Sequence, residues 1–113
     1  MEALKNLRCE SCRRGAPTVT PEEMSLLLPE VRHWQVEEQE IPRLARVFEF
    51  PDFVKALDFT NRVGAIAEEQ QHHPSLLTEW GRVTVKWWTH KIGGIHRNDF
   101  IMAAKTDDVF GEP

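Results

Sequence analysis

Apolar positions recur along this chain with two different periods, and together they predict seven elements. Apolar residues spaced three and four apart predict helices over residues 21–31, over residues 52–71, and from residue 97 until the pattern fades near residues 107–108. Alternating or short apolar runs predict strands over residues 33–37, 44–50, 76–80 and 82–90. The expected order is therefore helix, strand, strand, helix, strand, strand, helix.

The alternation is clearest over residues 82–90. Val83, Val85 and Trp87 share one face, whereas Trp88 and His90 share the other. Trp87 is accordingly expected in the core. Trp88 lies on the opposite face, where a tryptophan is either a stacking surface for a planar ligand or a subunit contact. In the strand over residues 44–50, the pattern does not decide which of the two faces is buried.

Capping signals define where the helices begin. Thr20 is followed three residues later by Glu23, with a proline at the first helical position, which is typical of a capping box. His96 and Asp99 have the same spacing at the start of the last helix. Gly64 interrupts the long helix at a cost of about 1 kcal/mol in helix propensity. We therefore expect another backbone to approach Gly64 closely.

The two pairs of consecutive strands are expected to form hairpins, because no crossover separates their members. The predicted fold class is α+β, a four-stranded antiparallel sheet with three helices packed on one face (α-β-β-α-β-β-α). Residues 1–19 form a polar N-terminal leader that offers little to a core, and residues 20–113 form a single domain. Because an open sheet has edges that need covering, a homodimer or homotetramer is expected.

Composition excludes several classes of protein. The chain has 113 residues, 41% of them hydrophobic and 28% charged, which is typical of one globular domain. Its formal net charge of -4 argues against a protein that coats nucleic acid, since neutralising phosphates requires a basic surface. No apolar run approaches the roughly 18 residues needed to span a bilayer, and no secretory signal is present. We expect a cytoplasmic protein without nucleic-acid or membrane partners.

The two cysteines, Cys9 and Cys12, stand in a Cys-x-x-Cys spacing within the leader. Such a pair supplies half of a zinc site, but the sequence contains no second cysteine pair. Three interpretations remain: two reduced thiols in a mobile segment, a metal site completed by a histidine, or an intermolecular disulfide.

Three of the five histidines fall in two short segments, one after the long helix and one at the end of the alternating strand. His72 and His73 follow the long helix, where the partial negative charge favours the imidazolium form, and Glu68 is spaced to meet His72 at i, i+4. His90 ends the alternating strand. A cationic and a neutral imidazole beside one substrate suit an elimination that delivers one proton and removes another. Two alternatives remain, namely capping of the helix end and a zinc site formed by the three histidines.

At these residues the sequence resembles a known family. The pattern Glu68-x-x-x-His72-His73-Pro74, followed by Trp80, Thr89-His90, Gly94 and Asp99, closely resembles the pterin-4a-carbinolamine dehydratases over residues 20–108. The Cys9–Cys12 tail and the segment from Trp80 to Trp88 are similar to the bacterial branch, which works with phenylalanine hydroxylase.

The resemblance implies dehydration of 4a-hydroxytetrahydrobiopterin to quinonoid dihydrobiopterin, which recycles the hydroxylase's spent cofactor without a metal or a bound cofactor. By this resemblance His72 and His90 are the acid-base groups that flank the 4a-hydroxyl. His73 binds the pterin and assists catalysis, and Glu68 tunes the histidines. The expected catalytic and substrate-binding set is Glu68, Gln71, His72, His73, Pro74, Trp88, Thr89, His90 and Lys91.

The sequence also departs from animal members of the family. These have an acidic residue or asparagine at the position of Gln71, and Ser-Thr-His-Glu or Ser-Thr-His-Cys in place of residues 88–91; His96 replaces an expected serine cap. The family forms oligomers by edge-strand pairing and helix packing. Its animal members also act as dimerisation cofactors of a homeodomain transcription factor, so a protein-binding regulatory module is the alternative function.

Overall fold

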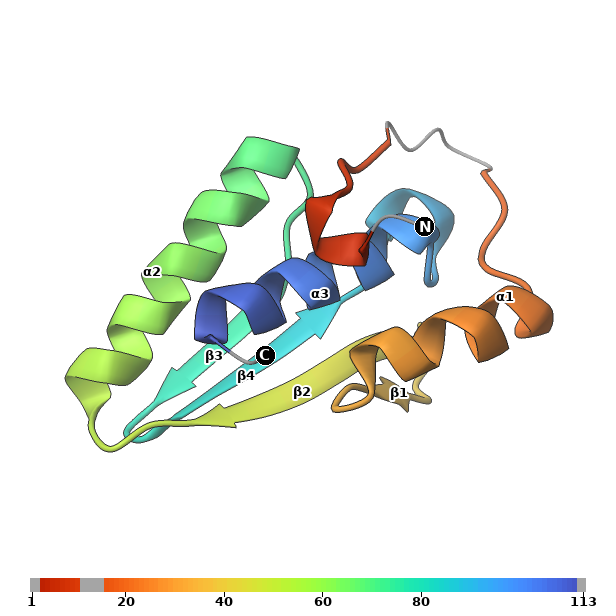
Figure 1. The fold of residues 1–113 in the computed structure, drawn as a ribbon. Helices are drawn as coiled ribbons and strands as arrows, with labels where there is room; N and C mark the ends of the chain where they lie inside the picture. The colour runs from red at the N-terminus through yellow and green to blue at the C-terminus, as the bar shows by residue number, and fades with distance from the viewer. Residues whose placement is uncertain (1–2, 11–15, 112–113) are drawn as a thin grey trace.

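The computed structural model describes residues 3–10 and 16–111 and contains the seven predicted elements together with three short 3-10 helices (Figure 1). The observed bounds differ from the predicted ones by a few residues. In chain order the elements are η1 (Leu4–Asn6), α1 (Pro21–Leu27), η2 (Leu28–Val31), β1 (Gln35–Glu37), β2 (Arg43–Glu49), α2 (Phe53–Gln70), β3 (Ser75–Glu79), β4 (Arg82–Trp87), η3 (His90–Ile92) and α3 (Arg97–Phe110).

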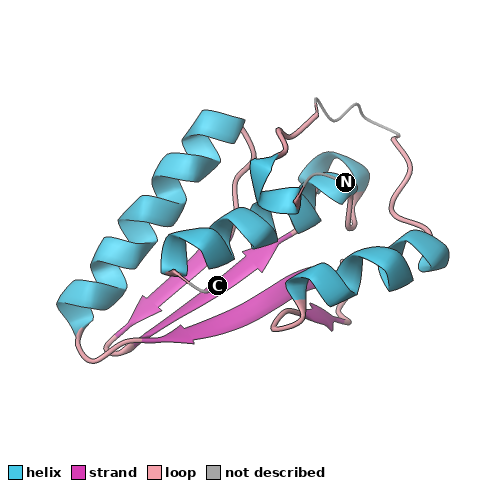
Figure 2. Ribbon diagram, viewed as in Figure 1, coloured by secondary structure: helices cyan, strands magenta, loops and turns pink. Residues whose placement is uncertain are grey.

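The four strands form one antiparallel sheet in the order β1-β2-β4-β3. The two hairpins join through β2 and β4, in a register that places Leu44 opposite Trp87 and Phe48 opposite Val83. The helices lie together on one side of the sheet (Figure 2). The predicted α+β class, with a four-stranded antiparallel sheet, is confirmed.

The core lies between the sheet and the helices. In β2, Leu44 and Phe48 are buried while Val47 is 51% exposed, which decides the face that the sequence left ambiguous. Trp87 is fully buried, as predicted. The helices and β4 complete this core with apolar side chains at helical and alternating spacing: Ala56, Phe59, Val63, Ala67, Val83, Val85, Phe100, Ile101, Met102 and Ala103.

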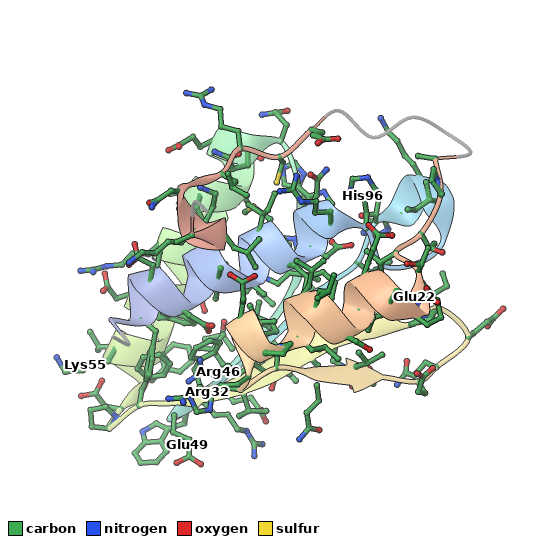
Figure 3. The ribbon with its side chains drawn as sticks, turned by 45° about the vertical axis from the view of Figure 1, so that its right-hand side comes forward. Glu22, Arg32, Arg46, Glu49, Lys55 and His96 are labelled. Atoms are coloured by element: carbon green, nitrogen blue, oxygen red, sulfur yellow. The ribbon has the colours of Figure 1, made fainter. Side chains whose placement is uncertain are left out.

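The predicted caps are present. The Thr20 side chain accepts a hydrogen bond from the Glu23 amide, and the Glu23 carboxylate accepts one from the Thr20 amide. At α3, His96 Nδ1 accepts from the Asn98 amide at 3.0 Å, and Asp99 accepts from the His96 amide. Figure 3 shows His96 at the start of α3. Each cap satisfies amides that a helix N-terminus otherwise leaves unpaired.

Two expectations from the sequence, one about Gly64 and one about the leader, are wrong. A Cβ atom added at Gly64 would meet no atom within 4 Å, so no neighbouring backbone explains this glycine. The leader also contributes to the core. Leu4 is only 5% exposed, and Leu7, Cys9 and Val19 pack against the core cluster. The 3-10 helix η1, which contains Leu4, lies against α3.

Within residues 3–10 and 16–111, no helix combines the length and the apolar character needed to cross a membrane.

Candidate active site

A cavity of about 350 Å³ lies where the end of α2, the segment after β4 and the start of α3 meet. Its lining comes from segments that are far apart in the sequence. Six of the residues singled out from the sequence line it: Gln71, His72, His73, Thr89, His90 and Lys91. The fold thus brings the two histidine-bearing segments together.

The end of α2 turns sharply to aim the histidines. Gln71 has a left-handed backbone with φ of 54°, which is uncommon for a residue other than glycine. The His72 amide bonds back to the Ala67 carbonyl at 3.1 Å, and the Gln71 side chain donates to the Glu68 carbonyl at 2.6 Å. Pro74 cannot continue a helix. The chain therefore leaves the helix axis at Gln71, and His72 and His73 enter the cavity wall.

Asp99 lies behind the cavity and joins three segments. Its carboxylate is fully buried and accepts from the Thr89 hydroxyl at 2.8 Å and from the His96 amide at 2.9 Å. Its other oxygen lies 2.6 Å from His72 Nε2. The sequence predicted only the capping role of Asp99. The same carboxylate also holds the side chains of Thr89 and His72 in place.

The surroundings of His72 fix both its ring plane and its tautomer. The indole of Trp87 stacks on the imidazole, with ring centroids 5.8 Å apart and 7° between the planes. A carboxylate only accepts hydrogen bonds, so Nε2 of His72 carries the proton directed at Asp99. In the neutral ring Nδ1 then holds the lone pair. His72 is therefore oriented as a proton acceptor at Nδ1.

His73, rather than His72, is the partner of Glu68. His73 Nε2 hydrogen-bonds to Glu68 Oε2, and both side chains are more than half exposed. The predicted pairing of Glu68 with His72 is wrong. It assumed that helical spacing continues to His72, whereas the left-handed Gln71 directs His72 toward Asp99.

Trp88 is buried, which corrects the expectation of an exposed tryptophan that serves either as a stacking surface or as a subunit contact. Only 9% of it is exposed, and the guanidinium of Arg43 lies 4.3 Å from the centre of its indole. Its other neighbour is His90, with ring centroids 4.5 Å apart. Regular pairing of β4 ends at Trp87, and Thr89 then bridges Gly94, so the chain turns immediately after Trp88. Trp88 supports His90 from behind.

Not every predicted residue lines the cavity. Glu68, Trp88 and Pro74 lie outside its lining. The side chain of Glu68 bonds to the lining residue His73, and Trp88 packs against the lining residue His90. Four residues outside the predicted site set also line it: Cys9, which the sequence analysis considered only for its thiol, and Glu10, Gln70 and Asn98. The apolar pair Leu4 and Leu7 was the one signal that the N-terminal segment docks on the domain. Cys12, and with it the interpretation of the cysteine pair, lies outside the described residues.

Across the described ranges 3–10 and 16–111, no group of three or more His, Cys, Asp or Glu side chains is placed to hold a metal ion. The zinc hypothesis is thus left to metal analysis of the protein.

Comparison with known proteins identifies the family to which the chain is similar. The family model described as Pterin 4 alpha carbinolamine dehydratase matches residues 17–109. A protein of Nitrosococcus oceani, provisionally named a pterin-4-alpha-carbinolamine dehydratase, is 57% identical over 110 residues, covering 96% of this chain and 97% of its own. A protein of Syntrophotalea carbinolica with the same provisional name is 54% identical over 108 residues, covering 95% and 96%.

Solved structures share the fold. The transcriptional coactivator/pterin dehydratase of Brucella melitensis matches with a TM-score of 0.77 and 30% identity, covering 84% of this chain and all of that one. A pterin dehydratase-like protein, described as a RuBisCO assembly factor in the alpha-carboxysome, matches with a TM-score of 0.60 over 71% of this chain and 92% of its own. At 21% identity, the second likeness concerns the fold alone. From the extent of the family match and the identity of these relatives, the chain belongs to the pterin 4 alpha carbinolamine dehydratase family.

Proposed function

We propose that this protein dehydrates 4a-hydroxytetrahydrobiopterin to quinonoid dihydrobiopterin and water by histidine general acid-base catalysis. The observation that carries the proposal is the convergence of His72, His73 and His90 on one cavity, with the buried Asp99 behind His72. In this reaction a proton leaves N5 and the C4a–O bond breaks. A C4a–N5 double bond forms, and the hydroxyl takes a proton and departs as water.

His72 suits the role of base. Its Nδ1 is the acceptor of the neutral ring, and the imidazolium formed on protonation would lie beside the Asp99 carboxylate. A carboxylate that orients an imidazole and stabilises its cation is the arrangement used in hydrolytic triads. The charge developed during N5 deprotonation is thus neutralised within the site.

His90 suits the role of acid toward the leaving hydroxyl, since it reaches the cavity from a different segment than His72. His73, which is bonded to Glu68 and lines the cavity, is proposed to bind the pterin. Gln71, Thr89 and Lys91 supply further polar groups to the lining. The pterin is the proposed substrate. Its elimination transfers no electrons to a second molecule, so the proposal requires no redox cofactor, and because the histidines move both protons it requires no metal.

The proposal extends to the setting of the reaction. Quinonoid dihydrobiopterin is the product from which the cofactor of phenylalanine hydroxylase is restored, so we assign the protein to that recycling in the cytoplasm. We also propose a homodimer or homotetramer. Phe53, Val54 and Leu57 on α2 are 44%, 75% and 43% exposed, and large exposed apolar groups on one helix favour burial against a second copy.

The deciding experiment measures 4a-carbinolamine dehydration by ultraviolet absorbance in a coupled phenylalanine hydroxylase reaction with chelator present. His72→Ala and His90→Ala are each expected to lower kcat on the order of a hundredfold, because each removes a proton-transfer group. The double variant should lose much less than the product of the two factors, since the groups act as a unit. His33→Ala, a histidine outside the cavity lining, is the matched control. No acceleration by the folded wild type would overturn the proposal.

A protein-binding regulatory module is the second candidate, and the exposed apolar side chains of α2 are the observation in its favour. The two functions make opposite predictions for the histidine variants. If His72→Ala and His90→Ala leave the biological role of the protein intact, binding is the function and the dehydratase proposal fails.

A further inference from the structure

We propose that residues 3–10, here named the strap, form a substrate-binding wall of the cavity, and that Gln70 and Asn98 are the positioning residues that hold this wall. The inference rests on the proposed dehydratase function, because it takes the pterin as the ligand. It assigns a role to a segment that precedes residue 17, where the match to the family model begins.

The strap runs along α3 from the C-terminal end of that helix toward its N-terminal end. Near its beginning Lys5 Nζ lies 3.2 Å from Asp108 Oδ1, and Lys105 Nζ donates to the Lys5 carbonyl at 2.9 Å. Leu4, the preceding residue, is buried in the core cluster. Figure 1 shows this segment, coloured red, against α3 beside the end of α2. The strap is thus a docked part of the domain.

At the cavity the strap is held by Asn98. The Glu10 amide donates to Asn98 Oδ1 at 2.9 Å, and Asn98 Nδ2 donates to the Glu10 carbonyl at 2.7 Å. Only 1% of Asn98 is exposed. A carboxamide supplies both a donor and an acceptor, so this one side chain pairs with the backbone as a neighbouring strand would. A buried reciprocal pair of this kind fixes the position of Glu10.

Gln70 holds Cys9, the residue of the strap that precedes Glu10. Its Oε1 accepts from the Cys9 amide at 3.0 Å. Gln70 is the last residue of α2, and Asn98 lies in the first turn of α3. The side chains of Gln70 and Asn98, here named the latches, therefore tie the strap to both helices that border the cavity.

The latches adjoin the groups proposed to act on substrate. Gln70 precedes Gln71, where the chain turns toward His72, and Asn98 precedes Asp99. Cys9 and Glu10 themselves line the cavity. A strap held there contacts the ligand, shields it from water and adds binding energy without taking part in proton transfer. Loss of the strap should therefore raise KM much more than it lowers kcat.

The test compares variants that remove a latch with matched variants that do not. Asn98→Leu and Gln70→Met replace latch amides by apolar groups of similar size. Asn61→Leu and Gln39→Met make the same chemical change at exposed sites outside the cavity lining. The latch variants are expected to raise KM about tenfold with kcat within about threefold, whereas the controls should stay within twofold of wild type.

A conservative variant separates the hydrogen bond from mere packing. Gln70→Glu keeps an oxygen acceptor for the Cys9 amide but loses the amide donor, so its KM should rise less than that of Gln70→Met. Asn98→Asp loses the donor and directs a carboxylate at the Glu10 carbonyl, so its KM should rise at least as much as that of Asn98→Leu.

Strap position is measured independently by the rate of Cys9 alkylation in a Cys12→Ser background. The latch variants should speed alkylation several-fold, and saturating 7,8-dihydrobiopterin, an unreactive pterin probe, should slow it in the protein with intact latches. If a latch variant is alkylated faster at Cys9, which shows that the strap is released, but its KM is unchanged, the inference is overturned and the dehydratase proposal is unaffected. Latch variants in which alkylation is no faster would have the same consequence.

Failure of the dehydratase proposal would look different. Wild type would then neither accelerate dehydration nor bind 7,8-dihydrobiopterin, although the latch variants would still expose Cys9. That result would also overturn the pterin as the ligand of the strap.

Discussion

At each end of α3 a carboxylate collects hydrogen bonds from other segments, but the donors are of different kinds. Asp99, in the first turn, accepts from His72, the Thr89 hydroxyl and a backbone amide. Asp107, in the last turns, accepts from the indole of Trp34 at 2.8 Å and from the guanidinium of Arg46 at 2.6 Å. Figure 3 shows His96 at the first end and Arg46 toward the second.

The difference lies in the proton chemistry of the donors. Imidazole gains and loses a proton near neutral pH, whereas indole and guanidinium do not. Arg46 is further fixed over the rings of Phe48 and Phe110, with its Cζ atom 4.2 and 5.5 Å from their centroids. One helix thus carries an aspartate at each end: Asp99 belongs to the candidate active site, and Asp107 attaches the helix to the sheet.

The largest effect is expected from Asp99→Asn. The amide retains an acceptor for the helix cap, but its NH₂ group disfavours the Nε2–H tautomer of His72 and it carries no charge to stabilise an imidazolium. We expect kcat to fall on the order of a hundredfold. The coupled dehydration assay measures this loss, and a fall of less than threefold would show that Asp99 is only a cap.

The same substitution at the other end, Asp107→Asn, should affect stability instead. It removes the negative charge that lies 2.6 Å from the guanidinium of Arg46, whose side chain is only 10% exposed. We expect the free energy of unfolding to fall by about 1–3 kcal/mol, with kcat within about twofold of wild type. Urea denaturation and the dehydration assay together test the contrast. A large loss of kcat in folded Asp107→Asn protein would abolish the distinction between the two ends.

Thr89→Val sharpens the comparison at the catalytic end. It removes one donor from the buried Asp99 carboxylate while keeping the shape of the side chain. Losing a bond of about 1 kcal/mol that positions the carboxylate should lower kcat roughly five- to tenfold. The assay is the same, with Thr84→Val, a half-buried threonine of β4, as the matched control. Equal losses in the two variants would contradict a specific role for Thr89.

The smallest effect on stability is expected where a carboxylate accepts hydrogen bonds at the solvent-accessible surface. Hydrogen bonds from Arg82 to the exposed Glu79 lower the pKa of that carboxyl. The associated stabilisation exists above the ordinary pKa of glutamate and is lost as pH falls through the lowered pKa. Because solvent screens the pair, Arg82→Gln should change Tm by less than about 2 °C at neutral pH. A shift above 5 °C in thermal denaturation would contradict this.

The sequence sufficed for the fold because its local signals agree with one another. The alternation of Val83, Val85 and Trp87 identified the buried face of β4, and the Thr20 and His96 caps identified the starts of α1 and α3. These features depend on neighbours within a few residues. The face of β2 remained open because Leu44, Ala45, Val47 and Phe48 are all apolar, and only the packed helices decide between them.

The site was predictable in its histidines but not in its supporting contacts. Glu68 was expected to meet His72 because helical spacing was extended through a residue that adopts a left-handed backbone. Asp99 was recognised as a cap, although its bond to His72 spans 27 residues and follows only from the assembled fold. Gln70 and Asn98 were missed for the same reason, since their partners lie 61 and 88 residues away.

The docking of the strap onto α3 has a consequence for the order in which the protein is made. The strap leaves the ribosome well before α3, which carries its binding partners, as the separation of 103 residues between Lys5 and Asp108 illustrates. Since chains emerge at about 5–20 residues per second, the N-terminal segment waits several seconds for its binding surface. One wall of the pocket is therefore completed only after α3 has been synthesised, when the sheet that supports it has had time to form.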